Sequence, residues 1–203
     1  MGSVLLALSG VGCAGDVNAA ELPDASAEPM ALADVPFNPA SVVHVHAIGG
    51  RPFDTCSGVV IAFERVATAA HCLTSDNLEV DGMPALVIDS DAFLDIALLD
   101  VAGLDRPLVP VAPELPDRAA EVFVAGYGCT GELEVRAGAF SGVVAPPQNQ
   151  IGKIEIRAVS CHGDSGGAIV DVEGRLLGTV STSNDFRHWT WGAPATALSF
   201  MLD

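Results

Sequence analysis

The chain has 203 residues, of which 50% are hydrophobic and 5% aromatic, and 26 acidic against 9 basic side chains give it a formal charge of -17. This length suits one compact unit or two small lobes, and the apolar fraction is sufficient for a buried core. So acidic a surface repels phosphate backbones and excludes nucleic acid as an expected partner, whereas it attracts cationic segments or simply keeps an exported protein in solution.

Residues 1–38 predict an export signal followed by a disordered tether. Residues 4–11 are apolar, too few to span a bilayer but typical of the hydrophobic part of a signal peptide. Two processing routes are open. Gly12-Cys13 resembles the end of a lipobox, in which Cys13 would be lipidated, and Val17-Asn18-Ala19 resembles an ordinary cleavage site. Residues 14–38 are rich in Ala, Asp, Glu and Pro without a period. We expect an exported protein, either extracellular or lipid-anchored in the cell envelope.

From residue 41 onward, short apolar segments alternate with turn residues. The predicted strands cover 41–48, 56–63, 65–69, 84–88, 96–101, 121–126, 138–145, 153–158, 167–172 and 175–181. Pieces of this length and spacing favour an all-β protein built from barrels. A helical turn is expected at 69–72 and a short C-terminal helix at 195–202. The proline-rich stretch 107–116 divides the chain, so we predict a first barrel over 39–112 and a second over 113–203.

A glycine-rich segment carries the first chemical motif. Ser165 stands in Gly163-Asp164-Ser165-Gly166-Gly167. A serine hydroxyl is a weak nucleophile until a base lies beside it, and its attack on a carbonyl creates an oxyanion that needs backbone N–H donors. Glycines beside the serine let the backbone turn tightly and present those donors. Taken alone, the segment is also compatible with a glycine-rich turn that holds an incidental serine.

Two further segments supply a base and an acid. His71 lies in Thr68-Ala69-Ala70-His71-Cys72, and histidine is the natural general base near neutral pH. Asp95 stands inside the apolar run Leu94-Asp95-Ile96-Ala97, where a buried carboxylate needs a partner. A structural histidine and a turn-capping acid are the plain alternatives. The chain order His71, Asp95, Ser165 differs from the orders found in subtilisins and α/β-hydrolases.

In these motifs and in their order, residues 41–201 resemble the trypsin/chymotrypsin family. The resemblance implies two packed antiparallel Greek-key β-barrels and a serine endopeptidase. Ser165 would attack the scissile carbonyl, His71 would carry its proton, and Asp95 would orient His71. The backbone N–H groups of Gly163 and Ser165 would form the oxyanion hole. We expect a monomer that acts on a polypeptide substrate.

The same resemblance places the substrate-binding residues around the nucleophile. The candidates are Val159, Ser160, His162, Ser181, Thr182 and Ser183. Val159, six residues before Ser165, takes the position where trypsins have an aspartate, so selection of Arg or Lys is not expected. Ser183 replaces a glycine on the wall of the specificity pocket and should narrow its entrance. We expect a preference for small or medium apolar residues before the scissile bond.

One contact of the family has no visible counterpart. Many relatives begin with Ile-Val-Gly-Gly after an activating cut, and the new amine pairs with the acid beside the nucleophile. No such string precedes residue 41, so Asp164 is left without its usual partner. Either activation proceeds differently in this chain, or other groups order the oxyanion loop. Gly126-Tyr127-Gly128 matches a turn of the family's second barrel.

Four cysteines besides Cys13 allow three disulfide pairings. The family pattern pairs Cys56 with Cys72, which would clamp the loop that carries His71. In many relatives the cysteine before the nucleophile motif pairs with a later one, but none follows Cys161 here, and the resemblance then leaves the pair Cys129–Cys161. Two disulfides imply an oxidising compartment, in agreement with an export signal.

The sequence holds no phosphate-binding glycine loop, zinc-type cysteine cluster or cofactor motif. His44 and His46 would share one strand face, but no third ligand is evident. We therefore predict neither a metal nor a cofactor. Two other functions stay open: a catalytically silent protein of the same fold that binds a partner, and a serine esterase that uses the same acyl chemistry.

Overall fold

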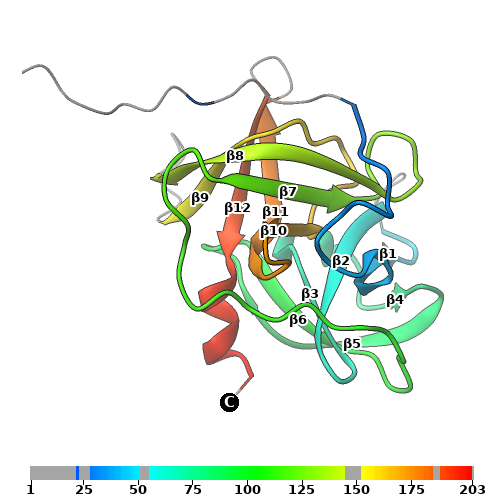
Figure 1. Ribbon diagram of the computed structural model, residues 1–203. Coiled ribbons are helices and arrows are strands. Elements are labelled where there is room, and N and C mark those ends of the chain that lie inside the picture. The colour runs from blue at the N-terminus through cyan, green and yellow to red at the C-terminus, as the bar shows by residue number, and fades with distance from the viewer. Residues whose placement is uncertain (1–21, 23–27, 51–54, 145–151, 185–187, 203) are drawn as a thin grey trace, which may run out of the picture.

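Two six-stranded antiparallel barrels make up the chain, which confirms the predicted all-β fold with its two packed barrels. The computed structural model describes residues 22, 28–50, 55–144, 152–184 and 188–202. Both barrels are closed, so neither leaves an unpaired strand edge. Figure 1 shows the first barrel at the lower right and the second at the upper left.

The first barrel has the strand order β1-β2-β3-β6-β5-β4. Its strands are β1 (Val42–Ala47), β2 (Thr55–Ala62), β3 (Arg65–Thr68), β4 (Leu78–Val80), β5 (Met83–Asp91) and β6 (Ile96–Asp100). A single 3-10 turn, η2 (Ala70–Cys72), follows β3. The turn between β5 and β6 ends at Asp95, so the folding of this barrel brings the predicted base and the predicted acid to neighbouring strand ends.

The second barrel has the order β10-β11-β12-β9-β8-β7. Its strands are β7 (Glu121–Gly126), β8 (Glu134–Val144), β9 (Lys153–Arg157), β10 (Ala168–Asp171), β11 (Leu176–Asn184) and β12 (Trp189–Pro194). The nucleophile segment is the loop that enters β10. The register of β11 against β12 shifts between Val180 and Thr182. Such a bulge turns one side chain away from its regular direction, and here that side chain is Ser181.

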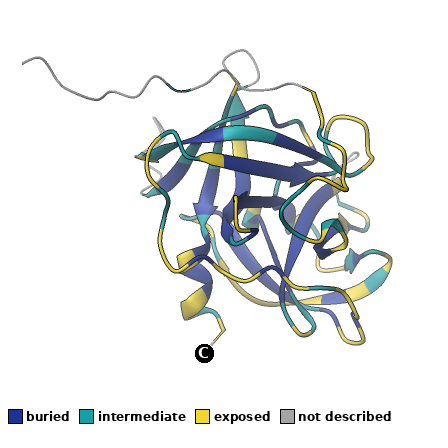
Figure 2. Cartoon of the chain, viewed as in Figure 1, coloured by how far each residue is buried: buried dark blue, intermediate teal, exposed yellow. Residues whose placement is uncertain are grey.

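Three apolar clusters hold the molecule together, one inside each barrel and one between them. Figure 2 shows much of both barrels in the dark blue of buried residues. β6 contributes to two of them, because Leu98 faces the cluster between the barrels and Leu99 faces the interior of the first. A strand buried on both faces reads as a continuous apolar run, which is why Ile96–Asp100 lacks polar alternation. Asp95 precedes this run and is therefore carried into the seam between the barrels.

Several elements of the structure differ from the prediction. β4 and β12 have no counterpart among the ten predicted strands, and β8 begins four residues earlier than predicted. β4 is only three residues long, and β12 contains Gly192 and ends at Pro194, residue types that are depleted in strands, so neither gives a continuous strand pattern of four to eight residues. The C-terminal helix is the 3-10 helix η3 (Ala195–Phe200).

The end of the predicted tether is ordered against the second barrel. The N–H of Met30 donates to the Val135 carbonyl at 2.7 Å, and Met30, Val35 and Phe37 pack on the cluster between the barrels. The composition of residues 14–38 as a whole predicted a disordered tether, and it did not show that these three apolar side chains would pack against the core. The apolar stretch 4–11 and Cys13 lie outside the described residues. Within the described ranges, no helix has the length and apolarity needed to cross a membrane.

Candidate active site

His71 and Asp95 form a close pair at the seam between the barrels. The Nδ1 atom of His71 lies 2.9 Å from Oδ2 and 3.0 Å from Oδ1 of Asp95, and the backbone N–H of His71 donates to Oδ1 at 2.9 Å. Asp95 has φ +60°, a left-handed conformation that aspartate tolerates better than most residues. Three contacts to one carboxylate fix the imidazole so that its other nitrogen, Nε2, is free to face a substrate.

The ionisation of Asp95 follows from these contacts. Burial alone would raise the pKa of Asp95, but hydrogen bonds from His71 and Ser181 outweigh it and hold that pKa below its ordinary value. The Asp95 side chain is 11% exposed against 48% for His71. A buried, ionised carboxylate therefore stands behind a base that solvent and substrate can reach.

Ser165 is tied to both barrels through its backbone. Its carbonyl accepts from the N–H of Ser57 on β2 at 2.7 Å, and the N–H of Gly166 donates to Val180 on β11 at 2.7 Å. Gly166 has φ +81°, and a Cβ there would lie 2.2 Å from both the Ser57 carbonyl and the Thr68 hydroxyl. Only glycine allows this approach, which explains why the motif places glycine directly after the serine.

The predicted oxyanion loop is braced by Ser57, a residue that the sequence reasoning missed. The Ser57 hydroxyl donates to the Gly163 carbonyl at 2.8 Å and accepts from the N–H of Tyr127 at 2.9 Å. Ser57 is fully buried, and Gly163 has φ +102°. Nothing in its local sequence sets Ser57 apart from the other small residues of β2, because its partners are more than 60 residues away along the chain.

A cleft of about 500 Å³ brings most of the predicted residues together. Its walls contain His71, Ser160, Cys161, His162, Ser165, Val180, Ser181, Thr182, Ser183 and Asn184. Val159 is not among these lining residues and is half-buried instead. The neighbouring Ser160 hydroxyl bonds to that of Thr190 at 2.8 Å. Of this pair only Ser160 lines the cleft, so the residue beside the expected specificity position presents a neutral hydroxyl there.

Asp164 has partners other than a chain terminus. Its carboxylate accepts from the N–H groups of Gly128 and Cys161, each at 2.7 Å, and the Arg136 guanidinium lies 4.0 Å away. A Cβ on Gly128 would lie 2.6 Å from the Asp164 carboxyl carbon, so glycine is needed there. Burial raises the pKa of Asp164 above its ordinary value, although both N–H groups and Arg136 act in the opposite direction. Of the two alternatives left open by the sequence, these contacts favour the second: backbone donors and Arg136 surround Asp164 in place of a terminal amine.

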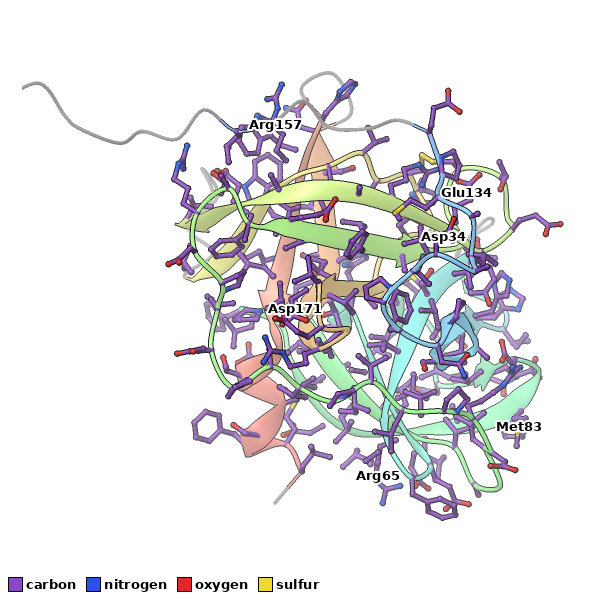
Figure 3. All side chains as sticks on the ribbon, viewed as in Figure 1. Asp34, Arg65, Met83, Glu134, Arg157 and Asp171 are labelled. Atoms are coloured by element: carbon purple, nitrogen blue, oxygen red, sulfur yellow. A yellow bond between two sulfur atoms is a disulfide. The ribbon has the colours of Figure 1, made fainter. Side chains whose placement is uncertain are left out.

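Arg136 is itself buried on β8 and is paired with Glu134, the first residue of that strand (Figure 3). The pair lies two residues apart on the same strand face. Sequence reasoning assigned no role to either residue, because the predicted strand begins only at residue 138. The oxyanion loop, which is distant in the sequence, packs next to Arg136 through Asp164.

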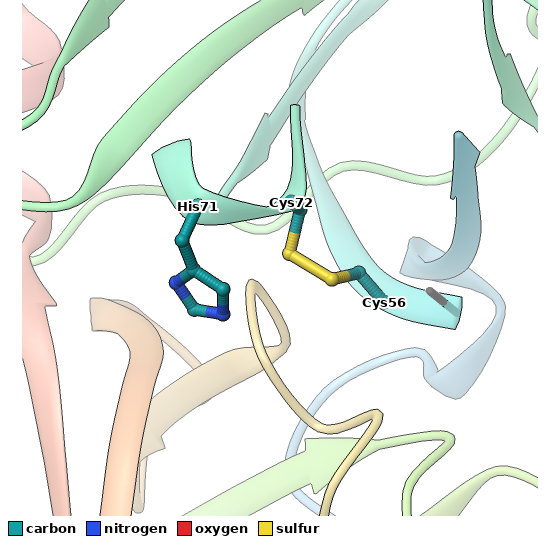
Figure 4. A group of neighbouring side chains, drawn as sticks. All are labelled: Cys56, His71 and Cys72. Atoms are coloured by element: carbon teal, nitrogen blue, oxygen red, sulfur yellow. A yellow bond between two sulfur atoms is a disulfide. The ribbon is translucent and has the colours of Figure 1, made fainter. Parts of the chain in front are cut away.

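Both predicted disulfides are bonded. Cys56 joins Cys72 with a Cα–Cα distance of 6.2 Å, and Cys129 joins Cys161 with one of 5.0 Å. The first bond links β2 to the turn that carries His71 (Figure 4). The second ties the loop after Gly128 to the segment just before the nucleophile motif. Covalent links therefore restrain both halves of the site.

The described residues offer two groups of possible metal ligands, Cys56–His71–Cys72 and Cys129–Cys161–Asp164. In each group the two sulfurs belong to a disulfide, and a metal ligand would have to be a thiolate. His44 instead stacks on Tyr127, with ring centroids 3.6 Å apart, and so joins β1 to the second barrel.

Comparison with known proteins points to one family. A model of the trypsin-like peptidase domain matches residues 56–178. The serine protease Rv3671c of Mycobacterium tuberculosis (strain ATCC 25618 / H37Rv) is 32% identical over an alignment of 178 residues, and the match covers 78% of this chain and 45% of that protein. The chain thus spans less than half the length of this relative.

Solved structures of that relative are similar over most of the chain. The Rv3671c protease in an inactive form has a TM-score of 0.69 at 27% identity, covering 81% of this chain and 88% of that one. The active form from M. tuberculosis has a TM-score of 0.72 at 24% identity, covering 98% and 93%. At 24% identity, the likeness to the active form shows a shared fold.

Proposed function

Because the chain belongs to the trypsin-like peptidase family, we propose that it is an exported serine endopeptidase in which Ser165, His71 and Asp95 form the catalytic triad. The observation that carries this proposal is the 2.9 Å contact of His71 Nδ1 with Asp95 Oδ2 on the wall of the cleft that Ser165 also lines. A carboxylate that orients an imidazole beside a serine is the arrangement that acyl transfer requires.

In the proposed reaction, the Ser165 hydroxyl attacks the scissile carbonyl while His71 Nε2 takes its proton. The imidazolium then gives the proton to the leaving amine, and the acyl-enzyme forms. Water, deprotonated by His71, hydrolyses that ester and restores the serine. Asp95 stays ionised throughout and stabilises each imidazolium intermediate.

The oxyanion of each tetrahedral intermediate would accept from the N–H groups of Gly163 and Ser165. Support comes from the loop itself, which Ser57 holds from the first barrel while Asp164 holds it from within. Donors that are fixed before the reaction need no rearrangement when charge develops. Ser181, Thr182 and Ser183 on β11 would hold the substrate backbone, and Ser160 and His162 would border the side chain before the scissile bond.

A fluorophosphonate probe tests the proposal, because it forms a bond from phosphorus to an activated serine and releases fluoride. We expect one adduct per folded chain, located on Ser165 by peptide mass spectrometry, and none on the urea-unfolded chain. An unlabelled wild type would favour a silent binding protein of this fold. A labelled protein that cleaves only ester substrates and leaves casein intact would favour an esterase.

For specificity we predict small or medium apolar residues before the scissile bond. Val159 offers no charge at the position that selects basic residues in trypsins, and the hydroxyls of Ser160 and Thr190 satisfy each other at 2.8 Å. A pocket without a buried acid leaves a lysine ammonium or an arginine guanidinium group uncompensated. A peptide-library cleavage profile checks this, and a profile dominated by Arg and Lys would show the prediction to be wrong.

Export is supported by the two disulfides, which persist in oxidising compartments. Whether Cys13 is lipidated can be read from metabolic incorporation of a palmitate analogue, with Cys13→Ser as the control. We further propose that the protein acts as a monomer on polypeptide substrates.

A further inference from the structure

The single lysine of the chain, Lys153, is buried directly behind the His71–Asp95 pair. It is the first residue of β9, and its side chain is 1% exposed. The alternation of β9 predicts the opposite. Ile154 and Ile156 fill the interior of the second barrel, so Lys153 shares the outer strand face with Glu155 and Arg157. A lysine buried on an outer face needs a nearby anion to offset its lost hydration.

That anion is Asp95. The Lys153 Nζ atom lies 3.7 Å from Asp95 Oδ2, and the Ser181 hydroxyl stands between them. Lys153 donates to the Ser181 hydroxyl, which in turn donates to Asp95 Oδ2. A hydroxyl has one proton to give and lone pairs to accept, so both bonds can exist together. The bulge of β11 at this point aims Ser181 into the gap.

We propose that Lys153 is a positioning residue of this site, whose buried ammonium acts through Ser181 to hold the Asp95 carboxylate ionised and turned toward His71. The proposal rests on the proposed function for its effect on catalysis. Asp95 has two oxygens, and the Lys153–Ser181 arm occupies Oδ2 from behind while His71 contacts both from the cleft. When His71 is protonated, the Asp95 carboxylate therefore lies between two positive charges, the His71 imidazolium and the Lys153 ammonium.

The consequence for pH follows from the sign of the charges. Removing the Lys153 ammonium lets Asp95 take up a proton more readily, and it also lets the remaining carboxylate stabilise the His71 imidazolium more strongly. Activity requires an ionised Asp95 and a neutral His71. Both effects therefore move the acidic limb of the activity profile to higher pH, and neither opposes the other.

The effect of other titratable groups near Lys153, Ser181 and Asp95 on the activity profile has to be distinguished from the effect of Lys153. His162 lines the same cleft from the loop before Ser165. Glu155, two residues along β9, is held by the Ser141 hydroxyl and by Trp191 Nε1. Asp164 lies on the far side of the nucleophile loop. The activity profile is therefore also measured in a His162→Gln background, which removes the second imidazole of the cleft.

The first test uses the lysine itself and needs no activity. Because the chain holds one lysine, [15N]lysine labelling gives a single side-chain ammonium resonance. Burial lowers the pKa of Lys153 below its ordinary value, and the Asp95 carboxylate offsets part of this lowering. Asp95→Asn removes that offset, so the resonance should titrate about one pH unit or more lower than in wild type. An unchanged titration would overturn the proposal.

The second test reads the reaction. Lys153→Met should move the acidic limb of kcat/KM and of fluorophosphonate labelling upward by roughly one pH unit, and Lys153→Arg should bring it back in part. Arg118→Met, which removes an exposed charge, should leave the limb in place. If Lys153→Met folds and the acidic limb of its activity profile stays at the wild-type pH, Lys153 serves folding alone.

Ser181→Ala covers the case in which Lys153→Met does not fold, since it keeps both charges and removes only the hydroxyl between them. Its limb should move in the same direction by a smaller amount, and an unmoved limb would contradict the proposal. If wild type is not labelled at any pH, the proposed function fails and the catalytic role of Lys153 fails with it. The lysine resonance would still report whether the charge coupling exists.

Discussion

Replacing Ser165 with alanine is expected to lower kcat for peptide hydrolysis by about a million-fold and to abolish fluorophosphonate labelling. The alanine variant retains the oxyanion donors and the cleft, so a residual rate well above that of water should remain. Ser165 contributes no side-chain hydrogen bond to the described structure, and neither its carbonyl bond to Ser57 nor the bond of the Gly166 N–H to the Val180 carbonyl on β11 depends on the hydroxyl. The variant should therefore fold as wild type does.

Asp95→Asn extends this test, because it keeps the shape of the side chain and removes the charge. The amide cannot accept from His71 with both of its terminal atoms as the carboxylate does, so the imidazole loses its fixed orientation and tautomer. We expect a loss of about 10,000-fold in kcat. The Ser165→Ala, Asp95→Asn double variant should lose no more than Ser165→Ala alone, since the residues act as one unit.

Asp89→Asn is the matched control, because Asp89 is an exposed acid on the neighbouring strand β5 whose side chain accepts a hydrogen bond from the N–H of the next residue, Ser90. Steady-state kinetics on one peptide substrate compare these four variants with wild type. Full additivity of the two losses would argue that Asp95 and Ser165 do not work together, and a fully active Ser165→Ala would place the nucleophile elsewhere.

The sequence alone allows the local parts of this site to be predicted. The glycines around Ser165 are needed for contacts within a few residues of the turn and across to β2, and they leave a recognisable string. Asp95 is visible as one acid in an apolar run because β6 is buried on both faces. The disulfide partners follow from a resemblance to known proteins together with the absence of a later cysteine.

The supporting residues escape sequence reasoning because their roles depend on contacts between distant strands. Lys153 and Arg136 each lie in a strand whose charged residues alternate with apolar or small ones, a pattern typical of a solvated face. Both faces are covered after folding, one by the first barrel at Asp95 and the other by the oxyanion loop at Asp164. Alternation along a strand gives the side on which a residue lies but not what packs against that side.

The same limit applies to strand assignment. β12 contains tryptophans, a glycine and a proline in six residues, and it is a strand because β9 and β11 pair with it on either side. β4 closes the first barrel with three residues that pair with β1 and β5. In both cases the barrel supplies the hydrogen-bonding partners, whereas the local sequence is too short or too interrupted to predict a strand.

Arg136→Met is expected to lower the free energy of unfolding at pH 7 by about 3–5 kcal/mol, because it removes the cation from a buried group that also contains two acids. Arg136 contacts Glu134 and lies 4.0 Å from Asp164, whose side chain is 1% exposed. Without the guanidinium, these two acids face each other with no opposing charge. The oxyanion loop should loosen as a result, and kcat should fall more than KM rises, since the loop acts on the transition state.

The loss of unfolding free energy in Arg136→Met should depend on pH, and its direction follows from the pKa of Asp164. Its pKa is already raised by burial, and Arg136 is one of the groups that oppose this rise, so the variant should have a still higher value. A carboxyl group whose pKa is higher in the folded than in the unfolded chain stabilises the fold below its unfolded value, and this stabilisation is lost as pH rises through the folded value. The deficit of Arg136→Met should therefore be small near pH 4 and grow toward pH 7.

Urea unfolding across this pH range measures the deficit, with Arg118→Met as the matched control on an exposed site. The control should stay within about 0.5 kcal/mol of wild type. Glu134→Gln placed in the Arg136→Met background should recover part of the stability, because it removes one of the two uncompensated acids. A deficit that is equal at all pH values would mean that Arg136 contributes packing rather than charge, and the oxyanion loop would then owe its order to the N–H groups of Gly128 and Cys161 alone.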